Sequence, residues 1–158
     1  MNDKISRERD GSSGVLCAGQ IKIPYTWPAG QAGSRFLVAL RDRMQLLGVR
    51  CPACQKVWVP PIRCLTCHQI GTEWVQVGPQ GTLETWTIVR TSVLPIQVLP
   101  VPYATGVIRL DGADTGLVHF LGGLEFSKLF SGLRVEPIFN TQRRGHILDI
   151  CYFQPVST

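Results

Sequence analysis

The pattern of apolar and polar positions divides the chain into one helical segment and a later series of short strands. Between residues 34 and 48, apolar side chains recur at spacings of three and four, and most of the charged residues lie elsewhere on the helical wheel. This period predicts an amphipathic α-helix. We expect Ser34 to be its N-cap and Gly48 to follow its last turn.

From residue 74 onwards, the pattern changes to short runs rich in β-branched and aromatic residues, with glycine, proline and aspartate between them. Such runs are typical of strands. The predicted strands are 82–90, 103–110, 116–121, 134–140 and 147–153, with a short helical segment at 124–130. Five strands with a helix between the third and fourth match a small Greek-key barrel of the OB type. The fold class is therefore expected to be mainly β.

Four cysteines form the most specific motif in the chain. Cys51 and Cys54 make one Cys-x-x-Cys pair, and Cys64 and Cys67 make a second pair after nine intervening residues. Each pair places two sulfurs on one tight turn, so that four thiolates can surround one Zn²⁺ ion with Zn–S distances of about 2.3 Å. Because a four-thiolate site leaves no position for water or substrate, we expect this zinc to be structural.

Other uses of these cysteines are less favoured. Residues 1–14 are polar and lack the apolar core of a secretory signal, so we expect a reducing, cytoplasmic location rather than disulfides. A redox Cys-x-x-Cys needs one exposed pair that opens a helix. A four-cysteine iron site uses the same ligands and stays an alternative. Cys17 and Cys151 are interpreted as a tail thiol and a buried strand residue.

The composition gives the chain a modest positive net charge, and the motifs along the chain divide it into four expected segments. No run of eighteen apolar residues occurs, so no membrane-spanning helix is predicted. The formal net charge is +5, and a zinc ion with four thiolates would lower it to about +3. We expect a disordered tail at 1–20, an extended arm and helix at 21–48, a rubredoxin-like zinc ribbon at 49–73 and an OB-fold barrel at 74–158.

Two further segments are open to more than one interpretation. The arm carries Tyr25 and Trp27 among prolines and glycines, and it packs either on its own domain or on a partner subunit. The segment 91–102 is apolar and uncharged and contains three prolines. It is expected either to fold over the barrel or to contact a partner or an acyl ligand.

No catalytic residue is predicted in this chain. A thiolase requires an activated cysteine, a histidine base and a second acid or base. Cys17 lies in the tail and Cys151 in an apolar run, and neither His119 nor His146 belongs to a catalytic motif. Glycine-rich phosphate loops, Gly-x-Ser-x-Gly and paired carboxylates are also missing from the sequence.

The order of these motifs resembles a known family. A helix is followed by Cys-Pro-x-Cys, then by Trp58-Val59-Pro60-Pro61, the second cysteine pair, OB strands and a closing Phe153-Gln154-Pro155. Over residues 35–155 this is similar to the acyl-CoA-associated zinc-ribbon/OB-fold family, a domain of unknown function. Gln55 and His68 stand where that family often has glycine.

The resemblance implies a non-catalytic subunit within a hetero-oligomer. Such subunits dock on a thiolase-like or acyltransferase catalytic subunit and help to shape the site for an acyl-CoA ester. Arg90, Arg143 and Arg144 are candidates to contact the ester or the partner, because guanidinium groups bind phosphate well. Plain surface charge is the alternative for each of the three.

A second hypothesis is a single-stranded nucleic-acid-binding protein, because OB barrels bind strands with aromatic residues in a basic groove. Trp86, Tyr103, Phe120 and Tyr152 could stack on bases, but all lie in predicted strands, where core packing explains them. Arg143 and Arg144 form the only basic cluster near aromatic residues, so nucleic acid is disfavoured as a partner. A metal-stapled scaffold without a ligand is a third, weaker hypothesis.

Overall fold

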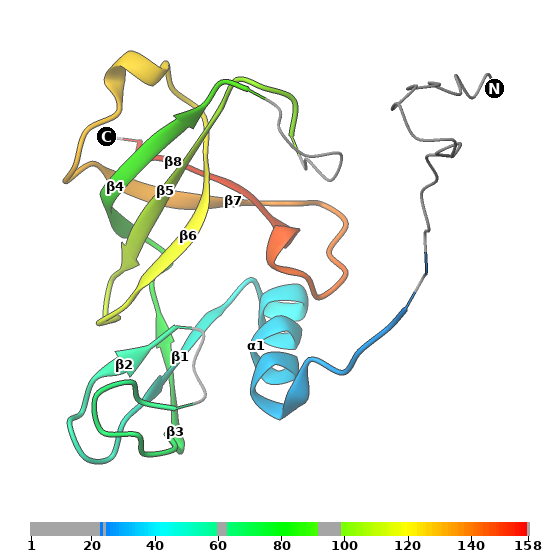
Figure 1. Ribbon diagram of the computed structural model, residues 1–158, viewed down its shortest axis with the longest axis vertical. Coiled ribbons are helices and arrows are strands. Elements are labelled where there is room, and N and C mark those ends of the chain that lie inside the picture. Colours follow the sequence, from blue (N-terminus) through cyan, green and yellow to red (C-terminus); the bar gives the residue numbers. More distant parts are fainter. Residues whose placement is uncertain (1–22, 24, 60–62, 92–98, 158) are drawn as a thin grey trace, which may run out of the picture.

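A closed five-stranded barrel, a three-stranded sheet and one α-helix make up the described part of the chain (Figure 1). The structure is a computed structural model, and it describes residues 23, 25–59, 63–91 and 99–157. The expected tail at 1–20, Cys17 and most of the segment 91–102 lie outside these residues. Within them, no helix is long and apolar enough to cross a membrane.

The barrel confirms the predicted mainly β, OB-type fold. It contains β4 (Gly81–Val89), β5 (Tyr103–Leu110), β6 (Gly116–Leu121), β7 (Arg134–Phe139) and β8 (Ile150–Pro155). The strands close in the order β4-β5-β6-β8-β7, with β4 paired to β7 and one parallel contact between Leu121 and Phe153. The predicted helical segment is a 3-10 helix, η1 (Phe126–Lys128), between β6 and β7. A second 3-10 helix, η2 (Ile147–Asp149), leads into β8.

The interior of the barrel is filled by aliphatic and aromatic side chains. Leu83, Ile108, Ile150 and Phe153 are completely buried there. Burial of each such side chain contributes roughly 1.5–3 kcal/mol. Along β5 and β6, buried positions alternate with more exposed ones. These side chains belong to one continuous apolar core that also includes residues of the helix and of the small sheet, such as Leu40 and Val57.

The smaller sheet carries the cysteine turns. It contains β1 (Leu46–Arg50), β2 (Val57–Trp58) and β3 (Glu73–Val77), in the order β2-β1-β3. The first cysteine pair lies between β1 and β2, and the second lies between β2 and β3, inside a bridge from Arg63 to Ile70. Because β1 pairs with β3 as far as Val77, this sheet continues to the start of the barrel.

The helix differs from its predicted limits at both ends. It is α1 (Gly30–Arg43), preceded by Ala29 without a side-chain cap, and Met44 ends it in a left-handed conformation with φ 55°. Ser34 lies inside the helix, and Gly48 lies in β1. The apolar pattern misled the prediction because β1 is buried on both faces, so that it continues the run of apolar residues past the helix.

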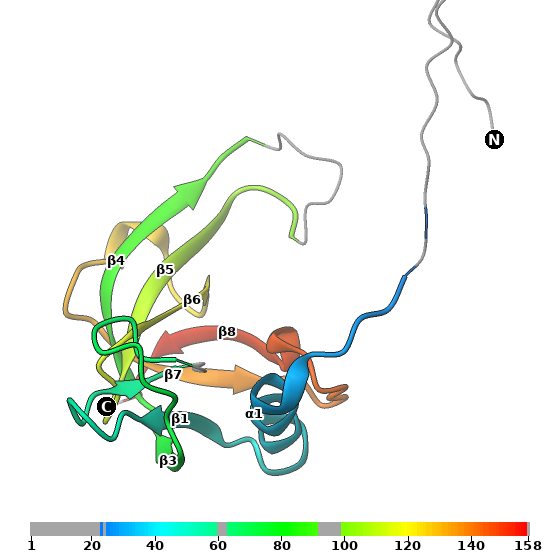
Figure 2. The same cartoon turned by 60° about the horizontal axis from the view of Figure 1, so that its bottom comes forward.

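The small sheet and the helix lie beside the barrel (Figure 2), and hydrogen bonds join both of them to it. At the turn between β5 and β6, Asp114 Oδ2 accepts from the Val57 amide at 2.8 Å, and Thr115 Oγ1 accepts from the Val59 amide at 2.9 Å. On the other side, Arg143 Nε donates to the Arg41 carbonyl near the end of α1 at 2.7 Å. The barrel thus holds the cysteine sheet through β2 and the helix through the segment before β8.

Candidate metal centre and adjoining surfaces

The four predicted cysteines lie together. The Sγ atoms of Cys51, Cys54, Cys64 and Cys67 are all within 4.8 Å of one another. The Cys54 and Cys64 sulfurs are 3.6 Å apart, which is far longer than the S–S bond of about 2.05 Å in a disulfide. All four are free thiols, with Cys51 and Cys64 buried and the other two partly exposed. This cluster could hold a metal ion.

Both cysteine turns are built in the same way. The amide of Gln55 donates to the Cys51 carbonyl at 3.0 Å, and the amide of His68 donates to the Cys64 carbonyl at 2.9 Å. Gln55 and His68 are in the left-handed region, with φ of 60° and 56°. Glycine adopts this conformation at no steric cost, whereas another residue pays roughly 1–2 kcal/mol. This geometry explains why glycine would suit both positions, which Gln55 and His68 occupy in this chain.

The electrostatics of the cluster favour a cation. Burial opposes the thiolate of Cys64, but hydrogen bonds from the amides of Cys67 and Thr66 outweigh it and lower its pKa to about 6. The neighbouring Cys54 side chain, with burial, raises the pKa of Cys67 to about 12. These opposite shifts of Cys64 and Cys67 show that one thiolate in the cluster opposes the ionisation of a neighbouring thiol, and a positive ion would remove that opposition. The number, softness and spacing of the four sulfurs fit a tetrahedral Zn²⁺ or iron ion.

Two arginines lie against the backs of the turns. Arg50 donates to the Gln55 carbonyl at 3.4 Å, and Arg63 donates to the His68 carbonyl at 2.6 Å. Each guanidinium group therefore fixes one turn and places positive charge near the thiolates.

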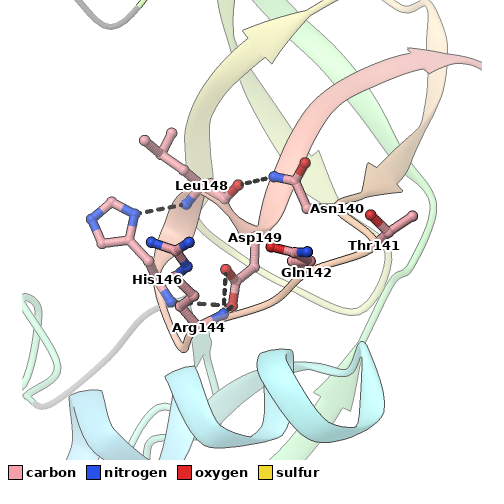
Figure 3. Close-up of a pocket in the computed structure, with 7 residues that line it drawn as sticks. All are labelled: Asn140, Thr141, Gln142, Arg144, His146, Leu148 and Asp149. Carbon is pink, nitrogen blue, oxygen red and sulfur yellow. Dashed lines mark hydrogen bonds between the residues drawn. The ribbon is translucent and has the colours of Figure 1, made fainter.

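A second candidate region is a hollow of about 470 Å³ beside η2 (Figure 3). Its residues are Asn140, Thr141, Gln142, Arg144, His146, Leu148 and Asp149. Asp149 is 4% exposed and accepts the backbone amides of Arg144, Gly145 and His146 at 2.7–3.2 Å. Burial opposes the ionisation of Asp149, but these amide bonds keep its pKa below the ordinary value. The loop is therefore organised around one buried carboxylate.

The structure separates the three predicted arginines. Arg144 lines the hollow. Arg143 instead donates to the carbonyls of Arg41 and Asn140, so that it holds the loop against α1. Arg90 is exposed just after β4. Sequence analysis missed the central residue, Asp149, although a lone aspartate inside an apolar run was a usable signal.

The remaining histidines and Cys151 have structural contacts. His119 is 5% exposed, its Nε2 lies 3.2 Å from the Ile147 carbonyl, and burial lowers its pKa, so its ring is neutral. His146 Nδ1 accepts the Leu148 amide at the start of η2. Cys151 donates its thiol proton to Asn140 Oδ1 at 2.9 Å. In the part of the chain that the structure describes, no histidine side chain hydrogen-bonds to a thiol.

The outer face of the barrel has few features that suit nucleic acid. A hollow of about 290 Å³ over β4, β5 and β6 is lined by threonine, tryptophan, glycine and valine. None of its lining residues is basic, whereas a single-stranded nucleic acid needs a positively charged groove. The rings of Tyr103 and Phe120 pack edge to face with their centres 5.6 Å apart, so these two proposed stacking residues contact each other.

Comparisons with known proteins agree with this architecture. Residues 74–140 match the family model described as "ChsH2, C-terminal OB-fold domain". A chain of the solved structure "Ltp2-ChsH2(DUF35) aldolase" is similar in fold, with a TM-score of 0.61 and 20% identity over 82% of this chain and 98% of that chain. A DUF35-family protein of unknown function from Sulfolobus solfataricus has a TM-score of 0.56 and 21% identity over 69% of this chain and 78% of that chain.

The search of curated proteins gave no match. The matched OB-fold domain and the two similar structures nevertheless point the same way: the chain has an OB fold, and its architecture is similar to that of DUF35 proteins.

Proposed function

We propose that this chain is a non-catalytic subunit of an acyl-CoA enzyme, docked on a thiolase-like catalytic subunit and helping to form the CoA-ester site. The observation that carries the proposal is the fold shared with 98% of a chain from a structure described as the Ltp2-ChsH2(DUF35) aldolase. That description names two components, Ltp2 and ChsH2, which supports a role for this chain as one partner in an enzyme complex.

The chemistry of the described residues supports an accessory role. The thiols of Cys51, Cys54, Cys64 and Cys67 converge on one point, so that their metal ion has no open position for substrate. We propose Zn²⁺ as this ion, and when bound it supplies folding energy to the small sheet. The thiol of Cys151 donates to an amide oxygen, and no histidine among the described residues hydrogen-bonds to it. The reacting groups are therefore assigned to the partner.

The hollow beside η2 is the proposed contact with the CoA ester. Arg144 offers a guanidinium group for phosphate, and the neighbouring amide and hydroxyl side chains of Gln142 and Thr141 can hydrogen-bond to a polar ligand. The negative charge of Asp149 is enclosed by backbone amides and turned toward them. Arg143 contributes by positioning the loop, and Arg90 is a secondary candidate.

The test is co-expression of the full chain with thiolase-fold proteins from the same genome. A stable complex with faster acyl-CoA turnover than the catalytic subunit alone is expected. Within that complex, Arg144→Ala should raise KM for the CoA ester about tenfold with little change in kcat, and Arg144→Lys should restore part of the affinity. Arg109→Ala, an exposed arginine on β5 that pairs with Glu84, is the matched control.

Two results would contradict the proposal. One is a chain that is stable and monomeric and copurifies with no thiolase-fold protein. The other is tight binding of single-stranded DNA or RNA that weakens steeply as salt rises, which would favour the nucleic-acid hypothesis instead.

A further inference from the structure

We propose that the arm, residue 23 with residues 25–29, and the hollow at the start of α1 form one docking surface for the catalytic subunit, which meets it with an apolar groove edged by acidic side chains. The inference rests on the proposed function and adds the part of this chain that binds the partner. Its evidence is the exposure of the arm, its continuity with the hollow, and the distribution of charge.

The arm presents large apolar side chains to solvent. Ile23, Tyr25 and Trp27 are 73%, 75% and 72% exposed, which is more than any other large apolar side chain in the described chain except Leu65. They occupy alternate positions, and alternate side chains of an extended segment lie on one face. The rings of Tyr25 and Trp27 are 5.4 Å apart. In both views the arm runs away from the sheet and the barrel (Figures 1 and 2).

Exposing these large apolar side chains to water is unfavourable in free energy for a protein that acts alone. Aromatic side chains bury large areas when they have a partner, and Tyr and Trp dominate the binding energy of many interfaces. The prediction that the arm packs on its own domain does not agree with these exposed fractions. Its alternative, contact with a partner, explains them.

The arm leads directly into a hollow of about 520 Å³ between α1 and the small sheet. Gly30 and Arg35 line it on the helix side, and Ile70 and Trp74 line it on the sheet side. Ile70 is 57% exposed, and the Arg35 guanidinium lies 4.8 Å from the centre of the Trp74 ring. The base of the arm therefore continues into an apolar depression with a cation at its wall.

The charge of this half of the molecule indicates the chemistry of the partner. Residues 23–74 contain six lysines and arginines but two acidic residues, whereas residues 75–158 contain six of each. Even with four thiolates and a divalent ion, the first half keeps a net charge of about +2. Arg35 is the charged residue that lines the hollow, and Arg63, whose backbone pairs with that of Ile70, donates to a carbonyl rather than to an acid. Acidic residues on the partner would complement this surface.

The same charge argues against a second copy of this chain as the occupant. A two-fold interface would place like surfaces against each other. Two positive faces would then meet, and their repulsion would weaken the binding of a second copy. A different protein with acidic side chains around an apolar groove has no such cost.

The experiment uses the full chain and the catalytic subunit that copurifies with it. Titration calorimetry compares wild type with the double variant Tyr25→Ser and Trp27→Ser, and Thr26→Ala, which lies between the two aromatic residues, is the control. Loss of two aromatic anchors should weaken Kd by 100-fold or more, and the control should change it less than threefold. Hydrogen exchange at 23–29 should slow when the partner is added, and binding should weaken as salt rises.

The outcomes separate the two proposals. If no catalytic subunit copurifies with the wild-type chain, the proposed function fails and the docking surface fails with it. If the subunit binds the double variant as tightly as wild type, or if exchange at 23–29 is unchanged in the complex, only the docking surface is overturned. Sedimentation of the isolated chain as an arm-dependent dimer would also overturn it, in favour of a second copy.

Discussion

The small sheet and the barrel reach a stable structure by different means. The barrel encloses large side chains that are completely buried, including Leu83, Ile108 and Phe153. The small sheet has a two-residue strand, β2, and its buried apolar residues near the cysteines are mainly valines. A segment of this size has too little apolar surface for a core of its own. Metal binding and contact with the barrel therefore have to supply its stability.

Metal removal tests this contrast most strongly. A structural Zn²⁺ site contributes on the order of 10–16 kcal/mol of apparent binding free energy. Chelation, or the double change Cys51→Ser and Cys64→Ser, should therefore unfold the small sheet while the barrel keeps its strands. Hydrogen exchange resolved by residue should show lost protection at 46–77 and retained protection in β5 and β6. Elemental analysis should find one ion per native chain.

Cys151→Ser is the matched control for metal removal. It removes a thiol that donates to Asn140 but lies outside the cluster, so that one ion per chain and the protection of the small sheet should remain. Unchanged exchange at 46–77 after complete metal removal would show that the sheet folds without the ion and would remove the basis of the comparison.

The loop between β7 and β8, which hydrogen-bonds to α1, is stabilised by a third means, a buried charge. Asp149→Asn replaces a carboxylate that accepts several amides with a group that offers one acceptor oxygen, and it should cost about 1–3 kcal/mol at pH 7. Because the folded pKa of Asp149 is lowered, its stabilisation is complete above the unfolded value of about 3.9 and is lost as pH falls through the folded pKa. Urea unfolding from pH 7 to pH 3 should show the difference between wild type and variant shrinking below pH 4.

Asp111→Asn is the comparison for that measurement. Asp111 pairs with Arg134 on the surface, and its pKa is also lowered by that partner, but exposed pairs contribute 0–1 kcal/mol. A larger loss for Asp111→Asn than for Asp149→Asn would contradict the importance of the buried carboxylate.

The sequence predicted most of the barrel strands well because their signal is local, but the predicted strand 147–153 was wrong at both ends: η2 occupies Ile147–Asp149, and β8 covers Ile150–Pro155. The limits of β5 and β6 match the prediction, since each strand alternates buried and exposed residues and ends at a turn. The metal cluster was also predictable, because the spacing of Cys51, Cys54, Cys64 and Cys67 by itself limits where the sulfurs can lie. In both cases one short stretch of sequence contains the constraint.

Features that depend on distant contacts were not predictable in the same way. The roles of Arg143 and Arg144 differ because the carbonyls of Arg41 in α1 and Asn140 accept hydrogen bonds from Arg143, whereas Arg144 lines the hollow. Asp149 is surrounded by amides of a loop whose path no pattern shows. The exposure of Tyr25 and Trp27 likewise depends on how far the arm lies from the rest of the chain.

The role of Gly48 is a final, smaller test of the small sheet. A Cβ at this position would lie 2.6 Å from Val57 Cγ1 and 3.1 Å from the Trp58 carbonyl oxygen, so Gly48→Ala should force β1 and β2 apart and destabilise the sheet by about 1–3 kcal/mol. Gly33→Ala, inside α1 with only Ala29 Cβ at 3.4 Å, should instead stabilise the protein by up to about 1 kcal/mol. Half of the metal should be removed from Gly48→Ala at a lower chelator concentration than from wild type. For Gly33→Ala this concentration should be unchanged. If both variants kept wild-type metal affinity and stability, close packing between β1 and β2 would not be what requires glycine at this position.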